Sequence, residues 1–177
     1  MTCQTNGAPI AAWVNGRLEA CDKLDVHRRG LRHPAVSVFL TVGAQTLLQR
    51  RALGKYHTPG LWANSCCTHP HWGESPRDCA IRRVQEELGL SGIDPRFMGQ
   101  VEYRADVGGG LVEHELVDIY RAEIQADQAL SPDRAEVMDV RWITPDRLKA
   151  EVLSQPDRFT PWLRIYVLDH AQRILGG

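Results

Sequence analysis

Short apolar blocks bounded by turn residues recur along the chain, and this pattern is typical of β-strands. Two such blocks lie on either side of Gly43-Ala44-Gln45 and predict a hairpin. Another follows the turn at Pro59-Gly60, and two more flank Gly108-Gly109-Gly110. The strands predicted in this way are residues 36–42, 46–50, 62–67, 97–103, 111–122 and 137–143.

The clearest helix is predicted over residues 76–88, because both of its ends are marked. Ser75 is a favourable N-cap, Pro76 suits the first helical position, and Gly89 ends the helix. Its apolar residues recur at helical spacing on one face, so the opposite, charged face is left free for chemistry. The apolar residues of this face are Ala80, Ile81, Val84 and Leu88.

Two further helices are predicted near the C-terminus, one from Pro145 to residue 153 and one from Pro161 to about residue 174. Together these elements indicate an α+β fold in which helices sandwich a mixed β-sheet. We expect a single domain over residues 17–177, preceded by an N-terminal arm over residues 1–16.

Composition supports an ordinary globular domain and excludes several functions. The chain has 177 residues, of which 43% are hydrophobic and 24% charged, and its net charge is −1. This charge balance argues against a nucleic-acid or membrane-surface binder. The longest apolar run, residues 35–42, is too short to span a membrane, and the N-terminus does not resemble a signal peptide. We expect reduced cysteines and a cytoplasmic protein.

The predicted helix carries most of the loop-helix-loop signature of Nudix proteins. Glu74, Arg82, Glu86-Glu87 and Gly89 all match that signature in spacing. Acidic side chains on one helix face can hold a divalent cation that neutralises a diphosphate. Alternatively, Glu86 and Glu87 simply solvate a helix end.

Two positions depart from the Nudix signature. Thr68 stands where the signature has glycine, and Arg83 stands where it has a glutamate that serves among the metal ligands of Nudix hydrolases. Arginine reverses the local charge, which makes hydrolysis doubtful and favours phosphate binding.

A second motif, Asn64-Ser65-Cys66-Cys67-Thr68-His69-Pro70, resembles the catalytic segment of type I isopentenyl-diphosphate isomerases, a family with a Nudix-like fold. The resemblance spans about residues 14 to 165. It continues through Lys23, His27, His33, Glu113-His114-Glu115 and Pro161-Trp162.

The resemblance implies a metal site with three histidines and two glutamates. In extended segments Cys67 and His69 point to one side, as do Glu113 and Glu115. Five nitrogen and oxygen ligands suit one Mn²⁺ or Mg²⁺, with Zn²⁺ as a further alternative. We expect a loop to bring together the histidines at positions 27 and 33. The implied ligands are His27, His33, His69, Glu113 and Glu115.

Other histidines and cysteines are expected to be structural. His57, His71 and His114 are interpreted as surface residues, and Cys66 should point away from Cys67. Cys67 itself is either a small buried side chain or, as the resemblance implies, a catalytic thiol.

The resemblance also implies a diphosphate pocket and an aromatic wall. Trp162 and Tyr103 would face a carbocation, although either could instead pack in the core. A Mg²⁺ bound to the substrate diphosphate would be held through Glu87. Each basic residue of the pocket could equally be a solvated surface charge. The implied diphosphate contacts are Lys23, Arg51, Lys55 and Arg83.

The activity implied is the interconversion of isopentenyl and dimethylallyl diphosphate through a tertiary carbocation. The resemblance places Cys67 and Glu115 on opposite faces of this small-molecule substrate as acid and base. Two alternatives stay open: a Nudix-type diphosphate hydrolase, and a non-catalytic Nudix-like module that binds a ligand. The sequence does not indicate an oligomeric state.

Overall fold

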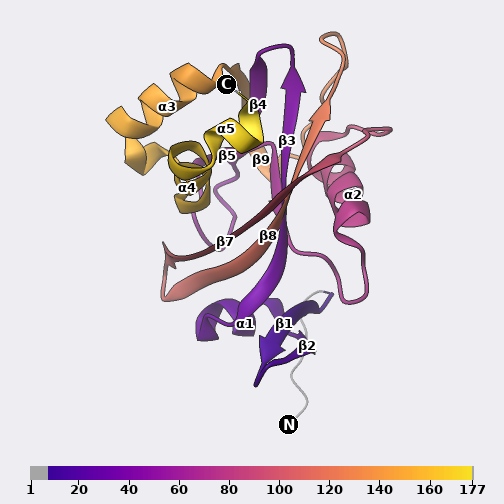
Figure 1. The fold of residues 1–177 in the computed structure, drawn as a ribbon, viewed down its shortest axis with the longest axis vertical. Coiled ribbons are helices and arrows are strands. Elements are labelled where there is room, and N and C mark those ends of the chain that lie inside the picture. The colour runs from indigo at the N-terminus through magenta and orange to yellow at the C-terminus, as the bar shows by residue number, and fades with distance from the viewer. Residues whose placement is uncertain (1–7, 177) are drawn as a thin grey trace.

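A seven-stranded mixed sheet forms the centre of the computed structural model, which describes residues 8–176 (Figure 1). The strand order is β5-β4-β3-β8-β7, with β6 also paired to β3 and β9 to β4. Strands β3 and β8 run parallel, and the other pairs are antiparallel. The strands are β3 (Arg32–Val42), β4 (Gln45–Arg51), β5 (Trp62–Asn64), β6 (Cys66–Thr68), β7 (Arg96–Gly108), β8 (Leu111–Glu123) and β9 (Val137–Ile143).

Helices cover both faces of this sheet, which confirms the predicted α+β sandwich (Figure 1). Helix α2 (Pro76–Leu88) packs on one face over Val36, Val38 and Leu40. Helices α3 (Pro145–Ser154) and α4 (Pro161–Asp169) cover the other face. The last predicted helix is interrupted at His170, which leaves helical geometry with φ −133°, so a short α5 (Ala171–Leu175) follows.

Both predicted caps of α2 are present. The Ser75 hydroxyl accepts a hydrogen bond from the Asp78 N–H at 3.1 Å. Gly89 ends the helix with φ +70°, and a Cβ there would lie 2.8 Å from Ser131, so only glycine fits. The charged face of α2 is therefore held in a fixed position beside the sheet.

The N-terminal segment is more ordered than an arm. β1 (Ile10–Val14) pairs antiparallel with β2 (Arg17–Cys21), so the predicted boundary at residue 16 falls inside a hairpin. Asn15 and Gly16 both have positive φ, as a type I′ turn requires. The Asn-Gly pair was the available sequence signal for this hairpin. Residues 1–7 of the predicted arm lie outside the described residues.

A short helix replaces the loop that was expected around His27. Helix α1 (Lys23–Arg29) begins where the Asp22 carboxylate accepts the Asp25 N–H at 3.0 Å, and it ends at Gly30 with φ +60°. The expectation of a loop is therefore wrong: His27 lies on a helix and His33 at the start of β3.

Strand register brings distant residues side by side. Ser37 on β3 faces Cys67 on β6, and His33 on β3 faces Glu115 on β8. Glu115 is also opposite Tyr103 on β7. The candidate site is thus built around the middle strands of the sheet.

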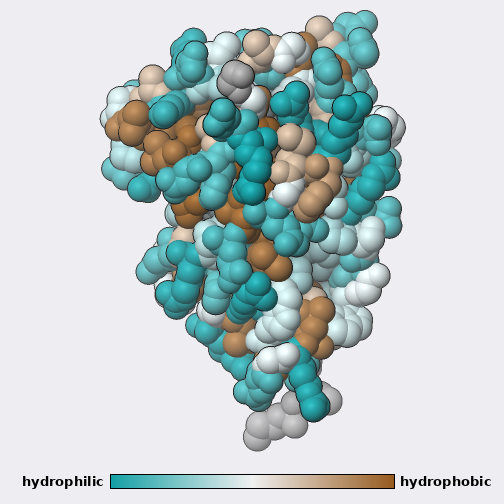
Figure 2. Space-filling view, viewed as in Figure 1, coloured by the Kyte–Doolittle hydropathy of each residue, from teal (hydrophilic) through white to brown (hydrophobic). Residues whose placement is uncertain are grey.

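The surface seen in Figure 2 is mostly hydrophilic, with apolar side chains gathered over α3, where Leu153 is 64% exposed. None of the helices within residues 8–176 has both the length and the apolar character needed to cross a bilayer.

Candidate metal centre and active site

Buried histidines and glutamates from five parts of the fold converge on one side of the sheet. One donor atom from each of His27, His33, His69 and Glu115 lies within 4.8 Å of the others. His27 also forms a second such group with His57 and Glu113. The structure therefore places the five predicted metal ligands in two groups that share His27, and it adds His57, which was expected at the surface.

Two of these imidazoles are oriented by backbone carbonyls. The His27 Nδ1–H donates to the Lys23 carbonyl at 2.6 Å, and the His33 Nδ1–H donates to the Leu31 carbonyl at 2.7 Å. Each ring is left with Nε2 facing the cluster, and the buried Nε2 of His27 has no hydrogen-bond partner among the described residues. An unsatisfied buried imidazole nitrogen fits a cation-binding site, since such atoms otherwise destabilise the fold.

Burial keeps the imidazoles of His27 and His69 neutral. It lowers the pKa of His27 to about 4 and holds the pKa of His69 well below its ordinary value. Neutral imidazole is the form that binds metals, so the rings are ready to act as ligands near pH 7.

The two glutamates share a tyrosine. The Tyr103 hydroxyl lies 2.6 Å from Glu115 Oε2 and 2.9 Å from Glu113 Oε2. Burial and the nearby Glu115 charge raise the pKa of Glu113. Burial acts in the same direction on Glu115, but contacts from His33 and His69 outweigh it and lower the pKa of that carboxyl. Glu115 is thus the carboxyl that stays ionised.

Cys67 lies on β6 with its thiol on the helix α4 side of the sheet. Its Sγ donates to Asn64 Oδ1 at 2.7 Å and lies 3.2 Å from the Ser37 hydroxyl. Burial raises the pKa of this thiol, so the sulfur carries its proton. Cys66 lies in the core beneath α2, so the adjacent cysteines point in opposite directions, as predicted.

One cavity is lined by the Cys67 thiol and by His57, His69, Glu113 and Glu115 of the cluster. Aromatic side chains and cations line it together, and Tyr103 and Trp162 are both buried there. The lining residues are Lys23, Arg51, Lys55, Tyr56, His57, Cys67, Thr68, His69, Arg83, Tyr103, Glu113, Glu115 and Trp162.

The cations of this cavity repel one another and weaken the hold of Lys23 on its proton. Burial, followed by the charges of Lys55, Arg83 and Arg51, lowers the pKa of Lys23 to about 8. The Arg51 guanidinium lies 5.3 Å from the centroid of the Trp162 ring. Four basic side chains around one cavity favour an anion, and all four predicted diphosphate contacts are among them.

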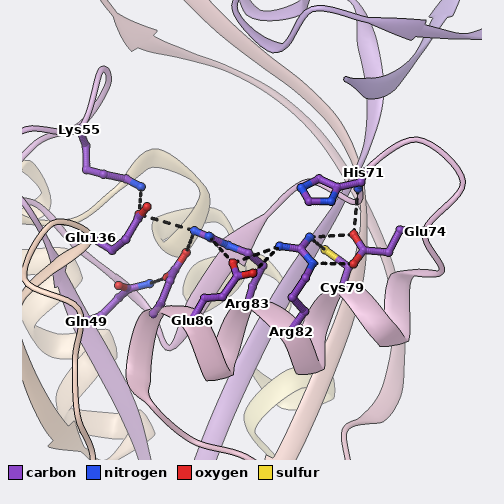
Figure 3. A network of polar contacts seen from close by, with 10 residues as sticks. Gln49, Lys55, His71, Glu74, Cys79, Arg82, Arg83, Glu86 and Glu136 are labelled. Atoms are coloured by element: carbon purple, nitrogen blue, oxygen red, sulfur yellow. Dashed lines mark hydrogen bonds and ion pairs between the residues drawn. The ribbon is translucent and has the colours of Figure 1, made fainter. Parts of the chain in front are cut away.

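Glu74, just before α2, and Glu86 and Glu87 on the helix are paired with arginines (Figure 3). Arg82 donates to Glu74 at 2.6 and 2.8 Å, and Arg83 contacts Glu86 at 2.7 Å. Arg83 also contacts the buried Glu87, whose other oxygen accepts from Gln49 at 2.9 Å. The helix therefore presents a neutralised face rather than a set of free carboxylates.

Two residues beside the cavity were missed by the sequence analysis. Glu136 binds Lys55 and lies 3.6 Å from Arg83, although no sequence motif includes it. The assignment of His57 to the surface is wrong, since this residue is only 6% exposed. His71 is exposed and His114 partly exposed, as expected.

Comparison with known proteins gives one family. The NUDIX domain family matches residues 31–163. Isopentenyl-diphosphate Delta-isomerase of Cereibacter sphaeroides (strain ATCC 17025) is 59% identical over 94% of both chains. The protein of that name from Dinoroseobacter shibae is 56% identical over 94% of this chain and 95% of its own. The protein of that name from Ruegeria pomeroyi is 54% identical over 96% of this chain and 94% of its own.

Solved structures of Nudix hydrolases share the fold. A MutT Nudix hydrolase from Burkholderia pseudomallei superposes with a TM-score of 0.60 at 18% identity, over 77% of this chain and 95% of that one. RenU, a Nudix hydrolase of M. smegmatis, gives a TM-score of 0.56 at 21% identity, over 92% and 90% of the two chains. At these identities the likeness concerns the fold alone.

Proposed function

We infer the reaction from the premise that this chain belongs to the NUDIX family and, within it, to the isopentenyl-diphosphate Delta-isomerases. Its function is the interconversion of isopentenyl diphosphate and dimethylallyl diphosphate, a step of isoprenoid biosynthesis. The observation that carries the proposal is a single buried cavity in which a protonated thiol, an ionised carboxyl and a tryptophan ring meet.

The reaction needs an acid, a base and protection from water. A proton is added at C4 of isopentenyl diphosphate and another is removed from C2, with a tertiary carbocation at C3 between the two steps. We assign these proton transfers to Cys67 and Glu115, which line the same cavity. Trp162 and Tyr103 would face the cation with their rings, since the negative face of an aromatic ring attracts positive charge.

A divalent cation fits the buried cluster. His27, His33, His69, Glu113 and Glu115 would hold it, because imidazoles and carboxylates are its preferred donors and the Nε2 of His27 lacks a partner among the described residues. We propose Mn²⁺ or Mg²⁺ here, with Zn²⁺ as the alternative. When bound, the cation supplies positive charge that stabilises ionised Glu115 and fixes its proton state.

The diphosphate would occupy the basic part of the cavity. Lys23, Arg51, Lys55 and Arg83 would contact its oxygens, and Glu87 would hold the Mg²⁺ that accompanies it. In the structure, Glu136 and Glu87 already neutralise Lys55 and Arg83, so an incoming diphosphate would exchange with these carboxylates.

A reducing compartment suits this chemistry. The described cysteines, including Cys67, are free thiols, and an acid–base thiol is useful only while it stays reduced. We therefore propose that the reaction takes place in the cytoplasm.

Hydrolysis of a diphosphate is the alternative that the fold keeps open. Free carboxylates on α2 would be required for it, whereas Arg82 and Arg83 pair with Glu74, Glu86 and Glu87. Isomerisation uses the buried cavity instead. A non-catalytic module would have no use for the Cys67 thiol.

Isotope exchange separates these possibilities. Either diphosphate, incubated with the protein and Mg²⁺ plus Mn²⁺ in deuterated water, should gain solvent deuterium. No phosphate should be released from the five-carbon chain. Release of phosphate without deuterium uptake would support a hydrolase and overturn the proposal. Cys67→Ala should abolish uptake and leave the fold intact, because the side chain that it shortens is small.

A further inference from the structure

His57 lies in the segment after β4 and enters the cluster from outside the predicted ligand set. Its Nε2 is 3.3 Å from Glu113 Oε1, and both side chains are at most 5% exposed. The ring stacks on His27 with an interplanar angle of 25° and a centroid separation of 5.8 Å. A buried imidazole in this position needs an explanation, because no family motif includes it.

The orientation of His57 matches that of the ligands proposed above. His27 and His33 each use Nδ1 for a hydrogen bond to the protein and turn Nε2 toward the cluster. His57 does the same: its Nδ1 is hydrogen-bonded to the Thr58 hydroxyl at 3.1 Å. Metal-binding histidines are typically fixed in this way through their second ring nitrogen.

The backbone beside His57 is held in an unfavourable conformation. Thr58 has φ +47°, which a β-branched residue rarely adopts, and its side chain is buried. Such strain persists at positions that the surrounding structure fixes and is concentrated at functional sites. Here it accompanies the contact between the Thr58 hydroxyl and the imidazole.

The spacing of the donor atoms fits ligands of one cation. Neighbouring donor atoms around one cation lie about 3 Å apart when each is about 2.1 Å from it. His33 Nε2 lies 3.2 Å from His69 Nε2 and 3.5 Å from Glu115 Oε1. The 3.3 Å between His57 Nε2 and Glu113 Oε1 falls in the same range.

We propose that His57 is a further metal ligand, which supplies Nε2 to the centre beside Glu113. This inference rests on the metal centre of the proposed function and extends its ligand set to four histidines and two glutamates. It also links the centre to the substrate pocket, since the His57 ring contacts Trp162 edge-on and its carbonyl accepts from Arg51 at 3.1 Å.

Titration of the metal-free protein with Co²⁺ tests the assignment, with the affinity and the visible d–d absorption as readouts. His57→Ala removes the imidazole, whereas His57→Gln keeps a hydrogen-bond donor near Glu113. His71→Ala is the matched control, because His71 is exposed and outside the cavity. His27→Ala reports on the centre itself. Circular dichroism of each metal-free variant verifies folding.

We expect His57→Ala and His57→Gln each to weaken Co²⁺ binding by more than about 100-fold, the upper end for residues that only orient a ligand. Both should change the d–d spectrum, while His71→Ala should match the wild type.

Two outcomes would overturn the assignment of His57. One is wild-type affinity in both variants while His27→Ala loses the metal; the other is rescue by His57→Gln, which would make His57 a positioning residue for Glu113. In either case the centre and the proposed function stand. Equal, weak binding by the wild type and His27→Ala would instead remove the centre and this inference with it.

Discussion

The charged face of α2 and the buried cluster beneath α4 contain the same kinds of acidic side chain in opposite states. Glu74, just before α2, and Glu86 on the helix are bound by Arg82 and Arg83 near the surface (Figure 3). In the cluster, Glu113 is 3% and Glu115 6% exposed, and they face imidazoles and a tyrosine. Paired surface carboxylates cost little, whereas buried ones require a compensating charge.

This difference shows where the chemistry of the fold lies in this chain. Arg83 replaces an acid of the Nudix signature, and its guanidinium contacts Glu86, Glu87 and Glu136. Until a diphosphate exchanges with them, these helix carboxylates are therefore occupied by the arginine. In the cluster, by contrast, the buried Nε2 of His27 and Nδ1 of His69 have no hydrogen-bond partner among the described residues. The Cys67 thiol nearby carries its proton.

The largest expected effect comes from breaking the cluster. His33→Ala removes a buried imidazole, and we expect turnover of isopentenyl diphosphate to fall by about 10²- to 10⁴-fold, the range for losing acid–base catalysis. Glu86→Ala, on the exposed helix face, should stay within about 3-fold of the wild type. Product formation followed by NMR measures both. Equal damage by the two variants would mean that the helix acids hold the essential cation.

Metal removal should separate the two regions through stability. Binding at 100 times the dissociation constant stabilises a protein by about 2.7 kcal/mol, which corresponds to about 5 to 10 °C in Tm for a domain of this size. We therefore expect a chelator to lower the Tm of the wild type by that amount in calorimetry. His33→Ala should show almost no response. A chelator effect that persisted in this variant would place the stabilising cation elsewhere.

Sequence patterns were informative where a single segment decides the structure. The caps at Ser75 and Gly89 predicted both ends of α2. The two-residue period of a strand predicted that Cys67 and His69 share one side of their segment and that Glu113 and Glu115 share one side of β8, and all four line the same cavity. Residues that depend on contacts between distant segments gave no such signal. His57 is an isolated histidine in a loop, and it joins the cluster only because the segment after β4 folds over β8.

Short elements were also missed, for a different reason. Helix α1 is too short to be stable by propensity alone and depends on the Asp22 cap and on burial of Val26. The contacts of Glu136 arise from the approach of the segment before β9 to the end of α2, which the local sequence does not encode.

An intermediate effect is expected where the two regions meet, at Arg83. Arg83→Glu restores the signature acid but places it beside Glu86, Glu87 and Glu136. Loss of charge-assisted hydrogen bonds to a diphosphate should lower kcat/KM for isomerisation by about 10- to 100-fold. Arg83→Lys, which keeps the charge, should be milder. Phosphate release gained by Arg83→Glu, with isomerisation unharmed, would show that the helix acids form a hydrolytic site.

The smallest expected effect concerns the stability contributed by the ion pair between Arg82 on α2 and Glu74 just before the helix. The hydrogen bond from Arg82 is the main cause that lowers the pKa of Glu74 to about 2, from 4.5. The ion pair therefore stabilises the fold fully above pH 4.5, and this stability is lost as pH falls from 4.5 toward 2. Solvent screening limits it to about 1 kcal/mol.

Denaturation of Glu74→Gln across this range should show a flatter pH dependence than the wild type, with turnover at pH 7 unchanged. Asp94→Asn, which breaks the more exposed pair with Arg77, should leave the wild-type profile intact. A Glu74→Gln variant as inactive as His33→Ala would erase the contrast between a helix face that supports the fold and a cluster that performs the chemistry.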